Sequence, residues 1–233
     1  MITKQTLLLA FKTALLPLVV LLSPNATASL LTFDFAATIR SIVVTTGSSD
    51  NLAILSDAGV GLGTVVTGNV VYDVTVPDNA PDTDTGRFLR PIVALQFTAG
   101  TLQEGFDTRT GAANSSVIIV QDGVLGSDTF NIQAETRDGL PGLMQTLFEL
   151  RLRSSNNLWD TDQMPASLPS LSMLDPFSAA DPGSTSINLV FIFSGSGIIT
   201  ARAEISALTQ VPLPPAAILM LSALWGLGRL RNP

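Results

Sequence analysis

The sequence predicts an all-β protein: a single antiparallel β-sandwich of jelly-roll type, flanked by an N-terminal signal helix and a C-terminal transmembrane helix. Apolar and polar residues alternate with a period of two over much of residues 29–208, which is typical of strands with one buried face. Turn residues separate these runs, as at Asp122-Gly123. No amphipathic helical run of useful length appears between them. Eight or so such strands predict two sheets packed face to face.

The first 28 residues have the features of a secretory signal peptide. Lys4 and Lys12 form a positive leader, and residues 14–22 form a short apolar core. Ala26 and Ala28 then place small side chains at the −3 and −1 positions. We therefore expect export by the secretion machinery and cleavage after Ala28 by signal peptidase.

Seven strands of the domain can be followed by the residues that share an apolar face. These are Phe33, Phe35, Ala37, Ile39 and Val43; Val66, Val70, Tyr72, Val74 and Val76; Val93, Leu95 and Phe97; Phe130, Ile132 and Ala134; Phe148, Leu150 and Leu152; and the hairpin formed by Ile187–Ser194 and Ile198–Ser206 around Gly195-Ser196-Gly197. Residues 155–182 lack the alternation and contain several prolines, which predicts a long loop packed over an edge of the sandwich. Residues from Thr209 onward are expected to link the domain to the apolar tail.

The C-terminal tail combines three features in a fixed order. Residues 211–215 read Val211, Pro212, Leu213, Pro214 and Pro215. Residues 216–228 are apolar apart from Ser222, and Arg229 and Arg231 follow. A helix from Pro214 to Gly228 would be roughly 22 Å long, shorter than a bilayer core of about 30 Å, so flanking arginines would have to reach the interface. Terminal arginines favour the cytoplasmic side, which places the domain outside the membrane.

This tail resembles the PEP-CTERM sorting signal, in the subclass that reads Val-Pro-Leu-Pro-x, over residues 211–231. The family's Pro-Glu-Pro is Pro212-Leu213-Pro214 here, and the basic cluster is limited to two arginines. The resemblance implies a Gram-negative source and an exosortase-like membrane enzyme that processes the tail near its prolines. It also implies brief residence in the cytoplasmic membrane before release or attachment at the cell surface. The chain is thus divided into a signal peptide (1–28), a β-domain (29–208) and a sorting signal (209–233).

Composition narrows the chemistry that the domain can perform. The chain contains no cysteine and no histidine, so it has no thiolate zinc site, no cysteine nucleophile and no histidine general base. All 19 acidic residues lie in the central stretch together with 8 of the 12 basic ones, which gives that stretch a formal charge of −11. Such a surface repels phosphates, so we predict no binding to nucleic acid. We also predict that the protein is not an enzyme and needs no cofactor.

One acidic loop could bind calcium. Asp73, Asp78, Asp82 and Asp84 crowd a strand end and the loop after it, and oxygen ligands at close spacing are what Ca²⁺ requires. Their spacing does not match an EF-hand. A solvated loop that uses Asp for turns is therefore the favoured explanation.

Two further alternatives involve residues near Trp159. Sugars commonly stack on exposed aromatic rings, and Trp159 is the one plausible platform in the domain. Asp160 and Asp162 could form the carboxylate pair of a glycosidase. The leading hypothesis is a non-enzymatic surface or extracellular-matrix protein, associated with exopolysaccharide and sorted by an exosortase-type system. A secreted carbohydrate- or Ca-binding module is the alternative, and an extracellular hydrolase is the third.

Overall fold

The structure, a computed structural model, describes residues 30–211 except 48, 81–83, 108–115, 124–126, 137–139, 141, 157, 160–162 and 196. The signal peptide and residues 212–233 lie outside the described residues. The predictions for Ala26 and Ala28, for the prolines of the sorting motif and for Arg229 and Arg231 therefore stay predictions. In the described part of the chain, no helix is both long and apolar enough to cross a membrane.

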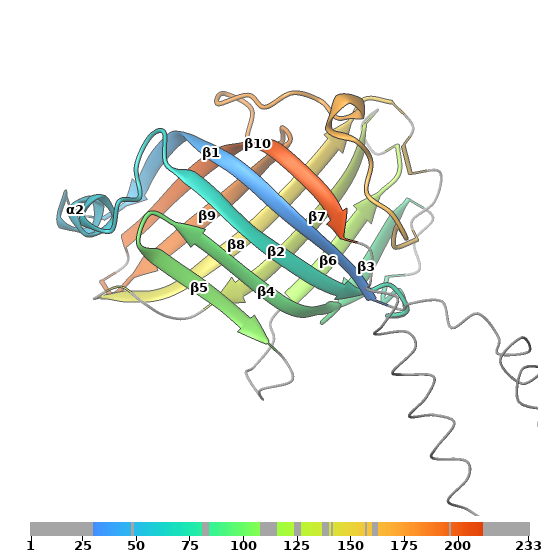
Figure 1. Ribbon diagram of the computed structural model, residues 1–233, viewed down its shortest axis with the longest axis horizontal. Coiled ribbons are helices and arrows are strands. Elements are labelled where there is room, and N and C mark those ends of the chain that lie inside the picture. Colours follow the sequence, from blue (N-terminus) through green and yellow to red (C-terminus); the bar gives the residue numbers. More distant parts are fainter. Residues whose placement is uncertain are drawn as a thin grey trace, which may run out of the picture.

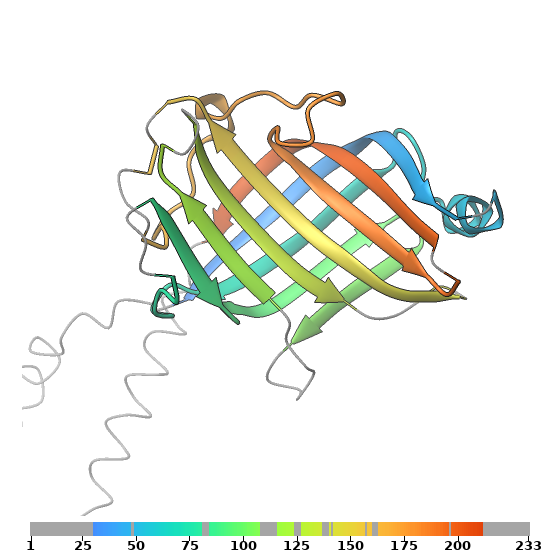
Figure 2. The same cartoon turned by 180° about the vertical axis from the view of Figure 1, so that it is seen from behind.

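The all-β class is confirmed, since the described residues form ten antiparallel strands and one α-helix (Figures 1 and 2). The elements are β1 (Leu30–Thr46), α2 (Ser49–Asp57), β2 (Val65–Asp73), β3 (Thr85–Leu89), β4 (Ile92–Ala99), β5 (Leu102–Asp107), β6 (Ser116–Gln121), β7 (Asp128–Thr136), β8 (Leu143–Ser154), the 3₁₀ turn η3 (Leu171–Met173), β9 (Ser186–Phe193) and β10 (Gly197–Val211). All ten strands belong to one sheet, in the order β3-β6-β7-β8-β9-β10-β1-β2-β4-β5.

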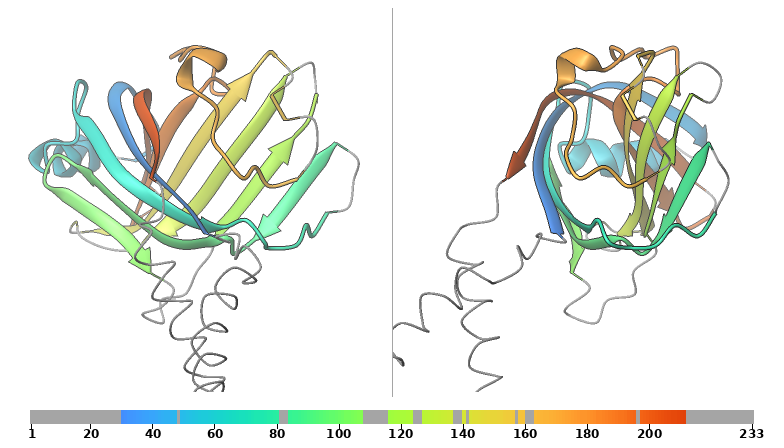
Figure 3. Two further views of the ribbon diagram at one scale, coloured as in Figure 1. Left: turned by 45° about the vertical axis from the view of Figure 1, so that its right-hand side comes forward. Right: turned by 90° about the vertical axis from the view of Figure 1, so that its right-hand side faces the viewer.

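The prediction of a jelly-roll sandwich is wrong, because one continuous sheet encloses the core. Phe97 of β4 lies 5.6 Å from Phe148 of β8, measured between ring centroids, although the two strands are far apart in the strand order. Phe35 of β1 also approaches Phe148, at 5.4 Å. The sheet must therefore curl so that its two halves face each other, as Figure 3 shows. Alternation identifies the buried face of each strand, but it cannot tell two facing sheets from one curled sheet.

Irregularities in β1 help the sheet to bend. Its register against β10 shifts at three places, including one between Ile39 and Ser41. Such bulges increase local twist and change which face a residue points to. Phe33, Phe35, Ala37 and Ile39 are buried as predicted, whereas Val43 is 48% exposed. The placement of Val43 in the core was wrong because the bulge reverses the alternation before it.

The ends of the curled sheet are covered by segments that do not belong to it. Helix α2 lies at one end, where Leu55 is fully buried, and residues of the 155–182 segment cross the other end (Figure 3). The sequence showed no helix here, since Ser49, Asp50 and Asn51 are more typical of turns and only one side chain of α2 is buried. The long loop was predicted, and in its described residues the short turn η3 is the only helical element.

Strand β10 is longer than expected. It continues to Val211, which pairs with Thr32 near the start of β1. Thr209 and Gln210 therefore belong to the sheet, and the linker does not begin at Thr209. Proline has no backbone N–H to donate to a ladder, so Pro212 is the first residue whose chemistry opposes continuation of the strand.

Candidate functional site

The predicted sorting motif begins at the last described residue of the sheet. Val211 is the last described residue of β10 and the first residue of the predicted motif. Its partner Thr32 lies two residues after Leu30, the first residue of β1. The start of the domain and the entry to the motif are therefore side by side at one end of the sheet.

The carboxylates of the predicted calcium loop are used locally. Asp73 Oδ1 accepts hydrogen bonds from the backbone N–H and the hydroxyl of Thr75, at 2.8 and 2.6 Å. Asp78 Oδ1 accepts from the N–H groups of Ala80 and Arg87, at 2.9 and 2.8 Å. The contacts with Thr75 and Ala80 form turns, and the contact with Arg87 fastens the loop to β3. Asp82 lies outside the described residues, and the described residues contain no group of three acidic side chains placed to hold a metal.

Trp159 does not form a sugar platform. Its side chain is only 7% exposed and packs against Phe130, with ring centroids 6.1 Å apart. The reason is Asp128, whose Oδ2 accepts hydrogen bonds from the backbone N–H groups of Leu158 (2.5 Å) and Trp159 (3.0 Å). This buried carboxylate pulls the loop onto the end of the core. Asp160 and Asp162, the predicted glycosidase pair, lie outside the described residues.

A charged network on the outer face of the sheet was not anticipated. We call it the outer clamp: Glu149, Arg151 and Arg153 of β8, Asn131 of β7, Asn188 of β9 and Arg202 of β10. Glu149 accepts hydrogen bonds from Asn131 (2.9 Å), Arg151 (2.6 Å) and Asn188 (2.9 Å). The spacing of Glu149, Arg151 and Arg153 at every second position of one strand was the sequence signal that could have revealed it.

The outer clamp fastens a strap formed by residues 175–185. Arg202 donates to the carbonyl oxygens of Ala179 and Asp181, and its guanidinium lies 5.6 Å from the ring centroid of Phe177. Arg153 donates to the carboxylate of Asp181 at 2.9 Å. These charged groups bond to one another or to backbone carbonyls. The outer clamp therefore has a structural role, which is to hold the strap against the outer face of β8–β10.

Two pKa shifts accompany this arrangement. Burial alone would raise the pKa of Glu149, but the hydrogen bond from Asn188, the charge of Arg151 and the remaining hydrogen bonds outweigh it and lower that pKa. Burial lowers the pKa of Arg202, and the charge of Asp181 partly offsets this effect. Among the described residues, neither Glu149 nor Arg202 contacts a nucleophile in a cleft. We therefore attribute both pKa shifts to structural contacts.

Inside the curl, one carboxylate links the two halves of the sheet. Glu104 of β5 is 5% exposed and accepts hydrogen bonds from the hydroxyls of Thr136 on β7 and Thr146 on β8, the latter at 2.7 Å. A buried carboxylate is stabilised in this way by charge-assisted hydrogen bonds. This contact turns the side chain of Glu104 away from the solvent-facing side of β5.

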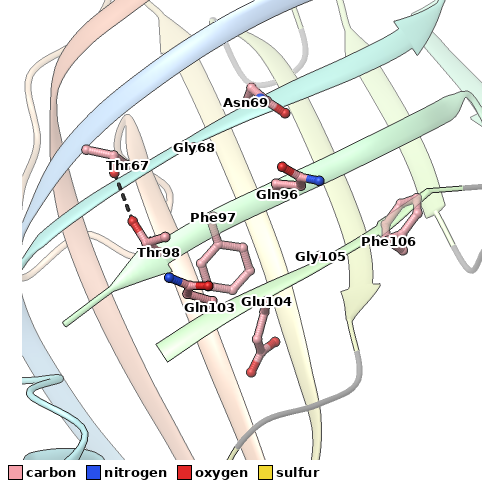
Figure 4. A pocket seen from close by; sticks show the side chains of 10 residues that line it. All are labelled: Thr67, Gly68, Asn69, Gln96, Phe97, Thr98, Gln103, Glu104, Gly105 and Phe106. Atoms are coloured by element: carbon pink, nitrogen blue, oxygen red, sulfur yellow. Dashed lines mark hydrogen bonds between the residues drawn. The ribbon is translucent and has the colours of Figure 1, made fainter. Parts of the chain in front are cut away.

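A groove of about 560 Å³ lies on the outer face of β2, β4 and β5 (Figure 4). Two rows of residues cross the three strands in register. Thr67, Thr98 and Gln103 form one row, and Asn69, Gln96 and Gly105 form the other. Glu104 is the only ionisable residue among those lining the groove, and its carboxylate is held inside by the two threonines. The groove thus presents uncharged amide and hydroxyl groups.

Comparison with protein-family models, with curated proteins and with solved structures gives no match for this chain.

Proposed function

We propose that the chain is an exported, non-enzymatic surface or extracellular-matrix protein that an exosortase-type membrane enzyme sorts by its tail. The observation that carries the proposal is the order of the C-terminal residues: Val211 to Pro215, an apolar segment, then Arg229 and Arg231. A sorting enzyme needs a substrate segment outside the folded domain. The pairing of Val211 with Thr32 supports this, because the motif's prolines come after the last described residue of β10.

The makeup of the domain supports a role in binding or structure rather than catalysis. The chain has no histidine and no cysteine, which removes the residues that most often serve as general base or nucleophile near neutral pH. The formal charge of its central stretch, −11, would keep it soluble and apart from other polyanions outside the cell. We infer that its partner there is the exopolysaccharide, and that the export and membrane enzymes are only transient partners.

Replacement of the motif's prolines tests this proposal. In cells that make the cognate exosortase-type enzyme, the double variant Pro212→Ala/Pro214→Ala should accumulate as full-length protein in the membrane fraction. The wild type should appear at the surface or in the medium. Pro77→Ala, in an exposed loop of the domain, is the matched control and should behave as wild type. Wild-type distribution of the double variant would contradict the proposal.

A further inference from the structure

We propose that the groove on β2, β4 and β5 binds a neutral polysaccharide chain through its amide and hydroxyl side chains. The inference rests on the proposed function, since it names the ligand that the exported domain would meet outside the cell. It does not depend on Trp159, which is buried.

The groups that would bind the polymer are free to do so. The side-chain amides of Asn69, Gln96 and Gln103 form no hydrogen bond to another described residue, and Gln96 and Gln103 are exposed. The hydroxyls of Thr67 and Thr98 bond to each other at 2.9 Å, which fixes their positions while leaving acceptor sites open. Pre-positioned groups lose less conformational entropy when a ligand binds.

The chemistry of these side chains matches uncharged sugars. Amides and hydroxyls both donate and accept hydrogen bonds, as sugar hydroxyls do. Adjacent strands lie about 4.8 Å apart, so Thr67, Thr98 and Gln103 offer polar groups at a regular repeat across three strands, and Asn69 and Gln96 across two. A regular array suits a polymer with a regular repeat. The acidic charge of the surrounding domain opposes a polyanion, which favours a neutral polymer.

Gly105 gives the groove its depth beside Gln96. A Cβ atom at this position would lie 2.3 Å from the carbonyl oxygen of Leu95 and 3.1 Å from Cγ of Gln96. A side chain would therefore collide with the floor and fill the groove. Phe106 pairs with the buried Leu95 and packs against the core, so its ring belongs to the inner face of β5, and the polar side chains seen in Figure 4 provide the surface for a sugar.

A polypeptide strand added to β5 is the competing occupant. β5 stands at one end of the strand order, so a second strand could pair with its backbone. That mode uses the edge of the sheet and not the side chains on its face. Replacing those side chains therefore separates the two modes.

The test measures binding of the full chain, in mild detergent, to dextran, mannan and galactan by calorimetry, with alginate as the polyanionic probe. At least one neutral polymer should bind. The double variant Gln96→Ala/Gln103→Ala should bind it at least about tenfold more weakly, because each lost hydrogen bond is expected to weaken binding by roughly two- to tenfold. Gln133→Ala, which removes an amide from the outer face of β7, is the matched control and should bind as wild type.

The outcomes separate this inference from the proposed function. Failure of all three neutral polymers to bind, stronger binding of alginate, or unchanged affinity of the double variant would each overturn the groove assignment. An unchanged melting temperature will show that the double variant is folded. The Pro212→Ala/Pro214→Ala protein should bind the same polymer with wild-type affinity, so that a defect in sorting and a defect in the groove are read independently.

Discussion

Glu149 holds three side chains of the outer clamp at once, and its ionisation should be visible in the stability of the protein. Glu149→Gln keeps the shape but removes the charge that Arg151 faces. We expect the free energy of unfolding to fall by about 1–3 kcal/mol at pH 7, as for other hydrogen bonds to charged groups. Urea denaturation of the two proteins measures this difference.

The pH dependence of the Glu149 effect has a definite sign. Its folded-state pKa is lower than the value of about 4.3 expected for an unfolded chain. The stabilisation is therefore complete above the unfolded value and is lost as pH falls through the folded one. The gap between Glu149→Gln and wild type should shrink at acidic pH, and a gap that is independent of pH would refute the assignment. Glu204→Gln, in an exposed pair with Arg40, is the control and should cost less than about 1 kcal/mol.

At the scale of elements, the segment 155–182 depends on contacts with the sheet end. Asp128 receives three backbone hydrogen bonds, from Gly123, Leu158 and Trp159. Tyr72, buried in the core, donates its hydroxyl to the carbonyl oxygen of Pro165 at 3.1 Å, and its burial raises the pKa of that hydroxyl. These buried polar groups fix the position of an irregular segment that has no backbone ladder to the sheet in its described residues.

Asp128→Asn should loosen this segment. The substituted amide would turn donor hydrogens toward backbone donors, at a cost of about 1–3 kcal/mol. We expect the fluorescence of Trp159 to shift to longer wavelength as its ring becomes hydrated, measured in a Trp225→Phe background because Trp225 is the only other tryptophan. Asp34→Asn, on the exposed face of β1, should leave the emission unchanged. An unshifted spectrum for Asp128→Asn would show that the carboxylate does not position the loop.

The elements also show what the sequence could and could not reveal. Period-two alternation correctly identified the buried faces of the strands around Phe35, Phe130 and Phe148, since burial on one face imposes that period directly. The sandwich was wrong because strand order depends on pairing between distant residues, which alternation does not encode. Strands β3, β5 and β6 were not identified individually. The groove also escaped notice, since it requires Gln96 of β4 to face Asn69 and Gly105 on neighbouring strands.

In the whole molecule, a curled β-domain precedes the tail that we propose as its sorting signal. The pairing of Thr32 with Val211 brings the entry to the tail beside the first strand of the domain. Processing near the prolines would then leave every described strand of the sheet intact, because β10 is described to Val211, which precedes them. The domain would keep its fold and its groove after release.

The C-terminal mass of the protein recovered from the extracellular or surface fraction tests this account most directly. Mass spectrometry of the C-terminal peptide should show an end at or near Val211 to Pro215, with the apolar segment and both arginines removed. A protein recovered there with its terminal residues, Arg229 to Pro233, intact would contradict the account.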